Sequence, residues 1–130
     1  MTLRVFLVED SAVIRDNLTA ALEELAPVEI VGFAEDEATA AAWILANRER
    51  CDLVVIDLFL RRGSGLELLR ETATLTEVRK LILSNYATPD MRRKCLELGA
   101  DRVFDKSNEI EALVDYCMRF DAGETSPVAL

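Results

Sequence analysis

Short apolar runs alternate with amphipathic helical patterns along almost the whole chain. Each run has the length and residue content of a strand, and the stretches between runs repeat their apolar residues at helical spacing. A strand-helix order repeated without a break predicts a parallel sheet with right-handed crossovers and helices on both faces. We therefore expect an α/β fold, a doubly wound (βα)5 domain with one five-stranded parallel sheet, whose strands cover residues 3–8, 28–33, 51–57, 78–84 and 102–105.

The third apolar run is the best candidate for the centre of the sheet. Its core, Leu53–Ile56, carries no polar residue on either face. An unbroken apolar pattern is typical of a parallel strand that is covered on both sides. We expect this strand to lie in the middle of the sheet.

Four of the runs end on residues that can carry metal or phosphate chemistry. Because the carboxyl ends of parallel strands lie along one edge of a sheet, residues from distant parts of the sequence should meet there. The residues at these ends are Glu9, Asp10, Asp57, Ser84, Asp105 and Lys106.

Capping residues mark the helix boundaries. Ser11, Asp36 and Thr88 each precede a helical pattern, as N-cap residues do. We expect Pro89 at the first position of the fourth helix and Gly99 just past its end. The last helix should take its cap from Ser107 or Asn108.

Composition limits the classes of protein to which the chain can belong. The 130 residues, 51% of them hydrophobic, suit one domain over residues 1–121, and the Gly, Ser and Pro content of residues 122–130 predicts a flexible tail. Fifteen Lys and Arg against 24 Asp and Glu give a formal charge of −9, which argues against direct contact with nucleic acid or an anionic membrane. The chain shows no secretory leader and no apolar run near the roughly 20 residues that cross a bilayer, so we expect a cytoplasmic protein. Cys51, Cys95 and Cys117 lack metal-type spacing and are expected as reduced thiols.

The polar strand ends point to chemistry at an aspartate. Glu9, Asp10 and Asp57 would bring three carboxylates together, and oxygen ligands of this kind suit Mg²⁺. Two adjacent acids at a helix start are by themselves more often plain solvent-facing residues, but Asp57 follows the most apolar run, where a lone carboxylate is costly. Lys106 could form a salt bridge with Asp57 or hold a phosphoryl oxygen, and Ser84 could be a simple strand terminator or follow the new oxygens. Together these residues can accept a phosphoryl group on aspartate.

The order of these residues resembles the receiver domain of bacterial two-component response regulators, in a single-domain form like the chemotaxis regulators. The likeness spans roughly residues 3–120, and Gly65 and the segment 98–100 also fit. It implies a flavodoxin-like receiver fold in which Asp57 takes a phosphoryl group from a phosphohistidine of a sensor histidine kinase or histidine phosphotransfer protein. It further implies Mg²⁺ held by Glu9, Asp10, Asp57 and the backbone carbonyl of Phe59, with Lys106 stabilising the phosphoryl group and Ser84 as the switch hydroxyl.

The resemblance also implies where partners would bind. The fourth helix, fifth strand and fifth helix are commonly the output surface of the family, for a downstream protein target or for a phosphorylation-dependent homodimer. Arg92, Arg93 and Lys94 form a basic cluster on the fourth helix, opposite its apolar stripe, which is either a solvated face or part of that surface. We expect either a stand-alone receiver that acts by protein contacts or a piece of a longer regulator, and the last residues favour a natural single-domain protein.

Three positions depart from the family pattern. Val103 stands where an aromatic residue is usual, and Phe104, on the opposite face of the strand, is expected in the core. Ser107 replaces a common proline, so we expect an ordinary trans peptide bond after Lys106. Phe59 and Tyr86 flank the expected phosphoryl site, where their bulk could obstruct water and prolong the life of the phosphorylated form.

Other functions fit the residues less well. A Mg²⁺-dependent phosphohydrolase with Asp57 as nucleophile would need an acid or base two residues later, where Phe59 stands. A flavin-binding protein would need a phosphate loop after the first strand, but the acids at 9 and 10 would repel phosphate. A degenerate receiver is disfavoured because all five site residues are present. We therefore expect a signalling domain that performs only self-phosphorylation and slow autodephosphorylation, not an enzyme acting on a free substrate.

Overall fold

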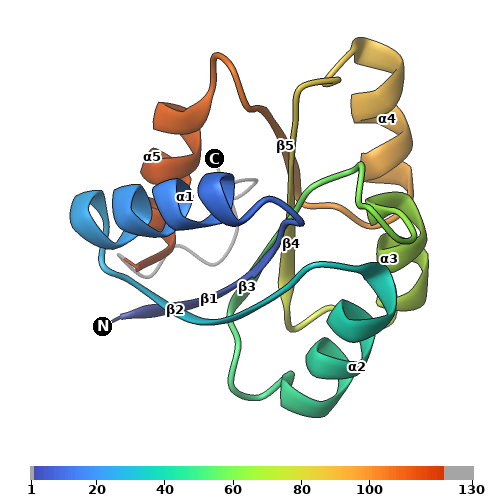
Figure 1. Cartoon of the computed structure of the whole chain (residues 1–130), viewed down its shortest axis with the longest axis horizontal. Helices are drawn as coiled ribbons and strands as arrows, with labels where there is room; N and C mark the ends of the chain where they lie inside the picture. The colour runs from blue at the N-terminus through green and yellow to red at the C-terminus, as the bar shows by residue number, and fades with distance from the viewer. Residues whose placement is uncertain (1, 122–130) are drawn as a thin grey trace.

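The computed structural model describes residues 2–121. Five strands in this range form one parallel sheet with the strand order β2-β1-β3-β4-β5 (Figure 1). β3 lies in the middle, and all four of its residues are buried, as the sequence predicts. The predicted α/β class and the five strands are confirmed, with differences of up to two residues at their ends. The strands are β1 (Leu3–Val8), β2 (Val28–Ala34), β3 (Leu53–Ile56), β4 (Arg79–Ser84) and β5 (Arg102–Asp105).

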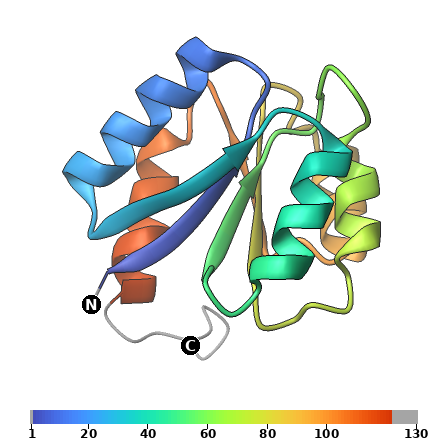
Figure 2. The ribbon, with the colours of Figure 1, turned by 60° about the horizontal axis from the view of Figure 1, so that its bottom comes forward.

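Helices cover both faces of the sheet (Figures 1 and 2). Leu18 of α1 and Leu113 of α5 share one buried cluster with Leu53 and Val55 of β3. The side chains that alternate with these along β3 enter the opposite cluster, against α2, α3 and α4. This is the period-two alternation of a strand buried on both sides. The helices are α1 (Ala12–Leu25), α2 (Glu37–Asn47), α3 (Gly65–Glu71), α4 (Pro89–Glu97) and α5 (Ile110–Asp121).

The predicted caps are confirmed for three helices. Ser11 Oγ accepts from Ile14 N at 3.3 Å and Asp36 Oδ1 from Thr39 N at 2.7 Å. Thr88 caps α4, with Pro89 in its first turn. Gly99 has φ +109°, the left-handed region that ends helices on glycine.

The predicted cap of the last helix is wrong. Leu113 N donates to the Glu109 carbonyl at 3.1 Å, which places the N-cap at Glu109 rather than at Ser107 or Asn108. Asp105 causes this shift, because its side chain accepts from Ser107 N at 2.7 Å and its carbonyl from Glu109 N at 2.9 Å. The resulting turn uses residues that the sequence pattern assigned to the helix start.

The three cysteines are buried free thiols, as predicted. Burial raises the pKa of Cys51 to about 11 and that of Cys117 to about 12. Both groups therefore stay protonated thiols at neutral pH and lack the thiolate character of a reactive cysteine. Among the described helices, none has the length and apolar character required to span a membrane.

Candidate functional site

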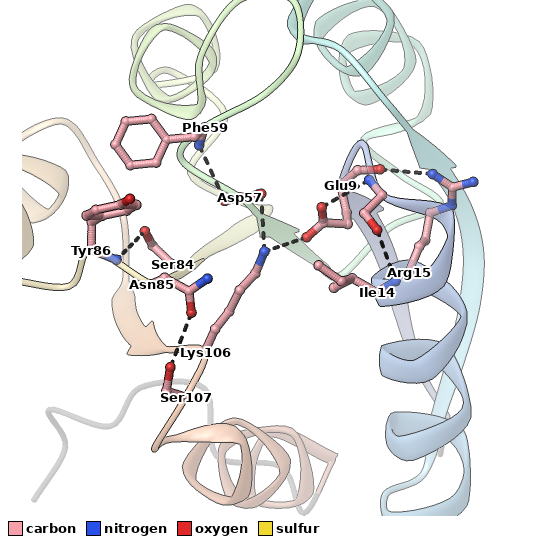
Figure 3. A network of polar contacts seen from close by, with 11 residues as sticks. Glu9, Ile14, Arg15, Asp57, Phe59, Ser84, Asn85, Tyr86, Lys106 and Ser107 are labelled. Carbon is pink, nitrogen blue, oxygen red and sulfur yellow. Dashed lines mark hydrogen bonds and ion pairs between the residues drawn. The ribbon is translucent and has the colours of Figure 1, made fainter.

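Four strands deliver polar side chains to one edge of the sheet (Figure 3). Glu9 follows β1, Asp57 follows β3, Ser84 ends β4 and Lys106 follows β5. The backbones of the two acids extend the sheet, because Glu9 N donates to Ala34 O and Asp57 N to Val8 O, each at 3.0 Å. The convergence that the sequence predicts is therefore built by the strand ladders themselves.

Three carboxylates gather at this edge. One oxygen each from Glu9, Asp10 and Asp57 lies within 4.8 Å of the others. Glu9 is buried and the Asp57 side chain is only 12% exposed, so neither charge is fully hydrated. Such a cluster needs a cation, because like charges this close in a poorly hydrated place repel strongly.

Lys106 supplies part of that positive charge. Its Nζ lies 2.7 Å from Glu9 Oε1 and 3.2 Å from Asp57 Oδ2. The sequence predicts the contact with Asp57, but the shorter one with Glu9 was not predicted. Three carboxylates and one ammonium still leave two negative charges at the site.

The pKa values of this pair follow from burial and charge. Burial is the largest cause at Asp57 and raises the pKa of its carboxyl; Lys106 lowers that pKa and Glu9 raises it, and the net shift is upward. Burial lowers the pKa of Lys106, but its hydrogen bond to Glu9 and the charges of Asp57 and Glu9 outweigh this, so that pKa is raised. Lys106 therefore stays an ammonium at neutral pH.

Arg15 holds the first acid in place, and the sequence analysis missed it. Its Nη1 donates to the Glu9 carbonyl at 2.9 Å and to Glu35 Oε2 at 3.2 Å. The guanidinium also stacks 3.9 Å above the Phe33 ring. A lone arginine in a helical pattern indicates a solvated face, so no signal in the sequence pointed to this role.

Gly65 allows α3 to approach the backbone of the central aspartate. A Cβ at this position would lie 2.6 Å from the Asp57 carbonyl oxygen and 2.9 Å from Leu58 Cα. Gly65 N donates to Leu58 O at 2.9 Å. Only glycine fits without moving the chain beside Asp57.

Ser84 and two aromatic residues complete the site. Ser84 is fully buried, and its Oγ accepts from Tyr86 N at 3.0 Å. Phe59 N donates to Asp57 Oδ1 at 3.3 Å. The rings of Phe59 and Tyr86 meet edge to face, with centroids 5.0 Å apart, and both are more than half exposed.

The predicted departures in β5 are also visible in the structure. Val103 is buried on the side of α4, and Phe104 is buried in the opposite cluster, so the prediction that Phe104 is core is confirmed. The described chain contains no cis peptide bond, in agreement with the expected trans bond after Lys106.

The basic cluster on α4 differs from the sequence interpretation. Arg93 pairs with Asp90 on the exposed face, but the Arg92 guanidinium turns inward to the Ala87 and Val103 carbonyls. The cluster is therefore not one continuous solvated patch. An arginine can make this turn because its fork of donors matches several fixed acceptors at once.

Comparison with known proteins agrees with this fold. The family model of the response regulator receiver domain matches residues 5–117. The chain belongs to the response regulator receiver domain family, and the class of protein that the resemblance implied is confirmed.

Relatives of this domain occur in several kinds of larger protein. A protein-glutamate methylesterase/protein-glutamine glutaminase of Koribacter versatilis is 31% identical over 85% of this chain and 31% of its own length. The DNA-binding transcriptional activator DevR/DosR of Mycobacterium tuberculosis is 34% identical over 75% of this chain and 44% of its own length. The chain thus spans less than half of either relative.

Solved structures show the same fold. A LuxR-family two-component response regulator from Aurantimonas superposes with a TM-score of 0.82 at 28% identity, covering 98% of this chain and 91% of that chain. The CheX-CheY complex from Borrelia burgdorferi gives a TM-score of 0.81 at 18% identity, covering 92% and 89%.

Proposed function

We propose that Asp57 accepts a phosphoryl group from a phosphohistidine, in a reaction that depends on Mg²⁺, and that the phosphorylated domain signals through protein contacts. The observation that carries the proposal is the position of Lys106 Nζ between Asp57 and Glu9 at a poorly hydrated edge. One cation is there paired with an acceptor carboxylate, beside an acid pair and a buried hydroxyl. These are the groups that phosphoryl transfer to aspartate requires.

In the proposed step a carboxylate oxygen of Asp57 attacks phosphorus, and the bond from phosphorus to the imidazole nitrogen breaks. The imidazole leaves neutral when its other nitrogen carries a proton, and the product on Asp57 is an acyl phosphate. Lys106 offsets the charge of the phosphoryl oxygens. The Ser84 hydroxyl accepts from Tyr86 N, so its own proton is available to a phosphoryl oxygen.

The donor set fits Mg²⁺. Glu9, Asp10 and Asp57 offer carboxylate oxygens and two uncompensated negative charges, and the ligands we propose are these three with the backbone carbonyl of Phe59. A bound Mg²⁺ would neutralise negative charge on the phosphoryl group. The chain's own contribution is to hold the acids close together, with Arg15 fixing the Glu9 carbonyl.

Incubation with acetyl phosphate tests this function by intact mass. We expect a Mg²⁺-dependent phosphoryl adduct on the wild type and on Asp115→Asn, an exposed aspartate on α5, but none on Asp57→Asn. An adduct that forms without Mg²⁺, or that survives in Asp57→Asn, would contradict the proposal. The same samples answer the phosphohydrolase alternative, which nothing in the fold or the comparisons favours: we expect no turnover of phosphomonoesters.

The phosphodonor would dock beside the acceptor. Ile14 of α1 is partly exposed, and a groove of about 370 Å³ runs from Ile14 past Lys106 to Ile110 of α5. An apolar rim of this kind suits the helix of a protein that presents its phosphohistidine to Asp57. We propose a sensor histidine kinase or a histidine phosphotransfer protein in this role.

We propose α4, β5 and α5 as the output surface, for a protein target or a phosphorylation-dependent homodimer. Leu96 on α4 and Met118 on α5 are half-exposed apolar side chains there. The net charge of −9 supports protein rather than nucleic-acid partners. The buried free thiols suit a reducing compartment, so we propose a cytoplasmic location, with a domain that performs its own phosphorylation and slow dephosphorylation only.

The aromatic pair is expected to prolong the phosphorylated state. Phe59→Ala and Tyr86→Ala should each shorten the half-life of the Asp57 phosphate by about threefold to tenfold, because their rings restrict the approach of water. Leu45→Ala, an exposed apolar residue of α2, is the control and should leave the half-life unchanged. Half-lives measured by mass that are equal in all four proteins would contradict the prediction.

A further inference from the structure

Arg92 of α4 joins three segments that are separate in the sequence. Its Nε donates to Ala87 O at 2.9 Å, its Nη1 to Val103 O at 3.0 Å and its Nη2 to Glu109 Oε1 at 2.6 Å. Ala87 lies in the β4–α4 loop, Val103 in β5 and Glu109 in the β5–α5 loop. One guanidinium therefore fixes the position of α4 against both loops.

The two loops that Arg92 holds begin at residues of the phosphoryl site. Ala87 is three residues after Ser84, and Glu109 is three residues after Lys106. Glu109 Oε1 also accepts from Asp105 N at 2.8 Å, and Lys106 N donates to Ser84 O at 3.0 Å. Together with the bonds of Arg92, these hydrogen bonds connect the phosphoryl site to α4 through both loops.

The neighbouring arginine shows what an ordinary surface role looks like. Arg93 pairs with Asp90 one turn away, where both side chains are mostly exposed. Arg92 instead donates to backbone carbonyls of two other elements, and its side chain is 34% exposed. Contacts of this kind form only when the backbone segments are in place, whereas a solvated surface charge needs no such partner.

We propose that Arg92 and Glu109 form a clamp that holds the β4–α4 loop in its unphosphorylated position and so couples Asp57 to α4. The proposal rests on the proposed function and deepens it. It assigns the coupling to a residue of α4, because β5 carries a buried valine, Val103, at the position where the family usually has an aromatic residue. Arg92 is in this sense a positioning residue, because it acts through the loops and not on the phosphoryl group.

The direction of the coupling follows from the hydrogen bonds of Ser84. Its Oγ accepts from Tyr86 N, so a movement of the hydroxyl toward a phosphoryl oxygen pulls on the start of the loop. The end of the loop is held at Ala87 by Arg92. The phosphoryl group and the clamp therefore favour different positions of the loop. Weakening the clamp should then increase the affinity of the site for a phosphoryl group or its mimic.

The test measures the affinity for beryllofluoride in Mg²⁺, a phosphoryl mimic, and the rate of phosphorylation by acetyl phosphate. We expect Arg92→Met to bind beryllofluoride about threefold to tenfold more tightly than wild type and to react faster by a similar factor. Glu109→Gln should act in the same direction and should add little in the Arg92→Met background, because both remove one clamp. Arg93→Met removes the same charge from the same helix and should match the wild type.

A gain in affinity separates the clamp from a merely structural role, which would lower affinity or leave it unchanged. The clamp alone would be overturned if the wild type is phosphorylated normally but Arg92→Met and Glu109→Gln bind beryllofluoride no more tightly than Arg93→Met. A wild type that takes no phosphoryl group would instead refute the proposed function, and the clamp with it. In wild type, the NMR signal of Arg92 Nε should shift on addition of beryllofluoride, and that of Arg93 Nε should not; if Arg92→Met does not fold, Glu109→Gln and this signal decide the question.

Discussion

Replacement of Lys106 by methionine is expected to lower the free energy of unfolding by about 3 kcal/mol in magnesium-free buffer at neutral pH. The change leaves Glu9 and Asp57 as neighbouring carboxylates with side chains only 5% and 12% exposed and no ammonium between them. Phosphorylation by acetyl phosphate should also slow by about 100-fold, because the charge that stabilises the phosphoryl oxygens is gone. Denaturant unfolding and intact mass measure the two effects. Lys94→Met, an exposed lysine of α4, is the matched control.

The loss of stability should depend on pH and on Mg²⁺. The folded pKa of Asp57 is raised, so its ionisation costs stability as the pH rises through that pKa, and the cost is absent below the unfolded value of about 3.9. The pKa of Lys106 is also raised, so its contribution is complete below its unfolded value of about 10.4. The deficit of the variant should therefore shrink as the pH falls toward about 4.

Two changes, one in the buffer and one in the sequence, should each restore stability to the Lys106→Met variant at neutral pH. Mg²⁺ would replace the missing positive charge, and Asp57→Asn as a second substitution would remove one of the three like charges. If the loss in free energy of unfolding is the same at all pH values and neither change reduces it, Lys106 acts by packing alone.

Replacement of Gly65 by alanine is expected to destabilise the domain by about 1–3 kcal/mol and to slow phosphorylation by about tenfold or more. The new Cβ would meet the Asp57 carbonyl oxygen at 2.6 Å and Leu58 Cα at 2.9 Å. Both are backbone atoms, so the overlap is relieved only by moving the chain that carries Asp57. Unfolding midpoints and initial rates of adduct formation measure the two effects.

Gly99→Ala is the control for this prediction. Gly99 has φ +109°, and a Cβ added there would meet no neighbouring atom within 4 Å, so alanine costs backbone strain without a collision. We expect a comparable loss of stability but a normal rate of phosphorylation, because Gly99 lies at the end of α4, away from Asp57. Equal losses of rate in the two variants would mean that Gly65 acts only through global stability.

The strands and their polar ends were predictable because the signals for them are local. The apolar runs set the strands to within two residues, and Ser11, Asp36 and Thr88 mark helix starts through bonds that reach only three residues. The same local reasoning was wrong at the last helix. There Asp105 competes with Ser107 and Asn108 for the backbone donors of the turn, and the pattern of apolar residues does not record that competition.

The sequence by itself determined the fold class and the residues at the carboxyl edge of the sheet, since both follow from the order and period of apolar residues. The tertiary structure decided which long cationic side chain meets which acceptor. Lys106 lies closer to Glu9 than to Asp57, Arg15 holds the Glu9 carbonyl, and Arg92 leaves the solvent face for two carbonyls. A flexible side chain with several donors selects among acceptors that are distant in the sequence, and their positions are set only when the strands and helices have packed.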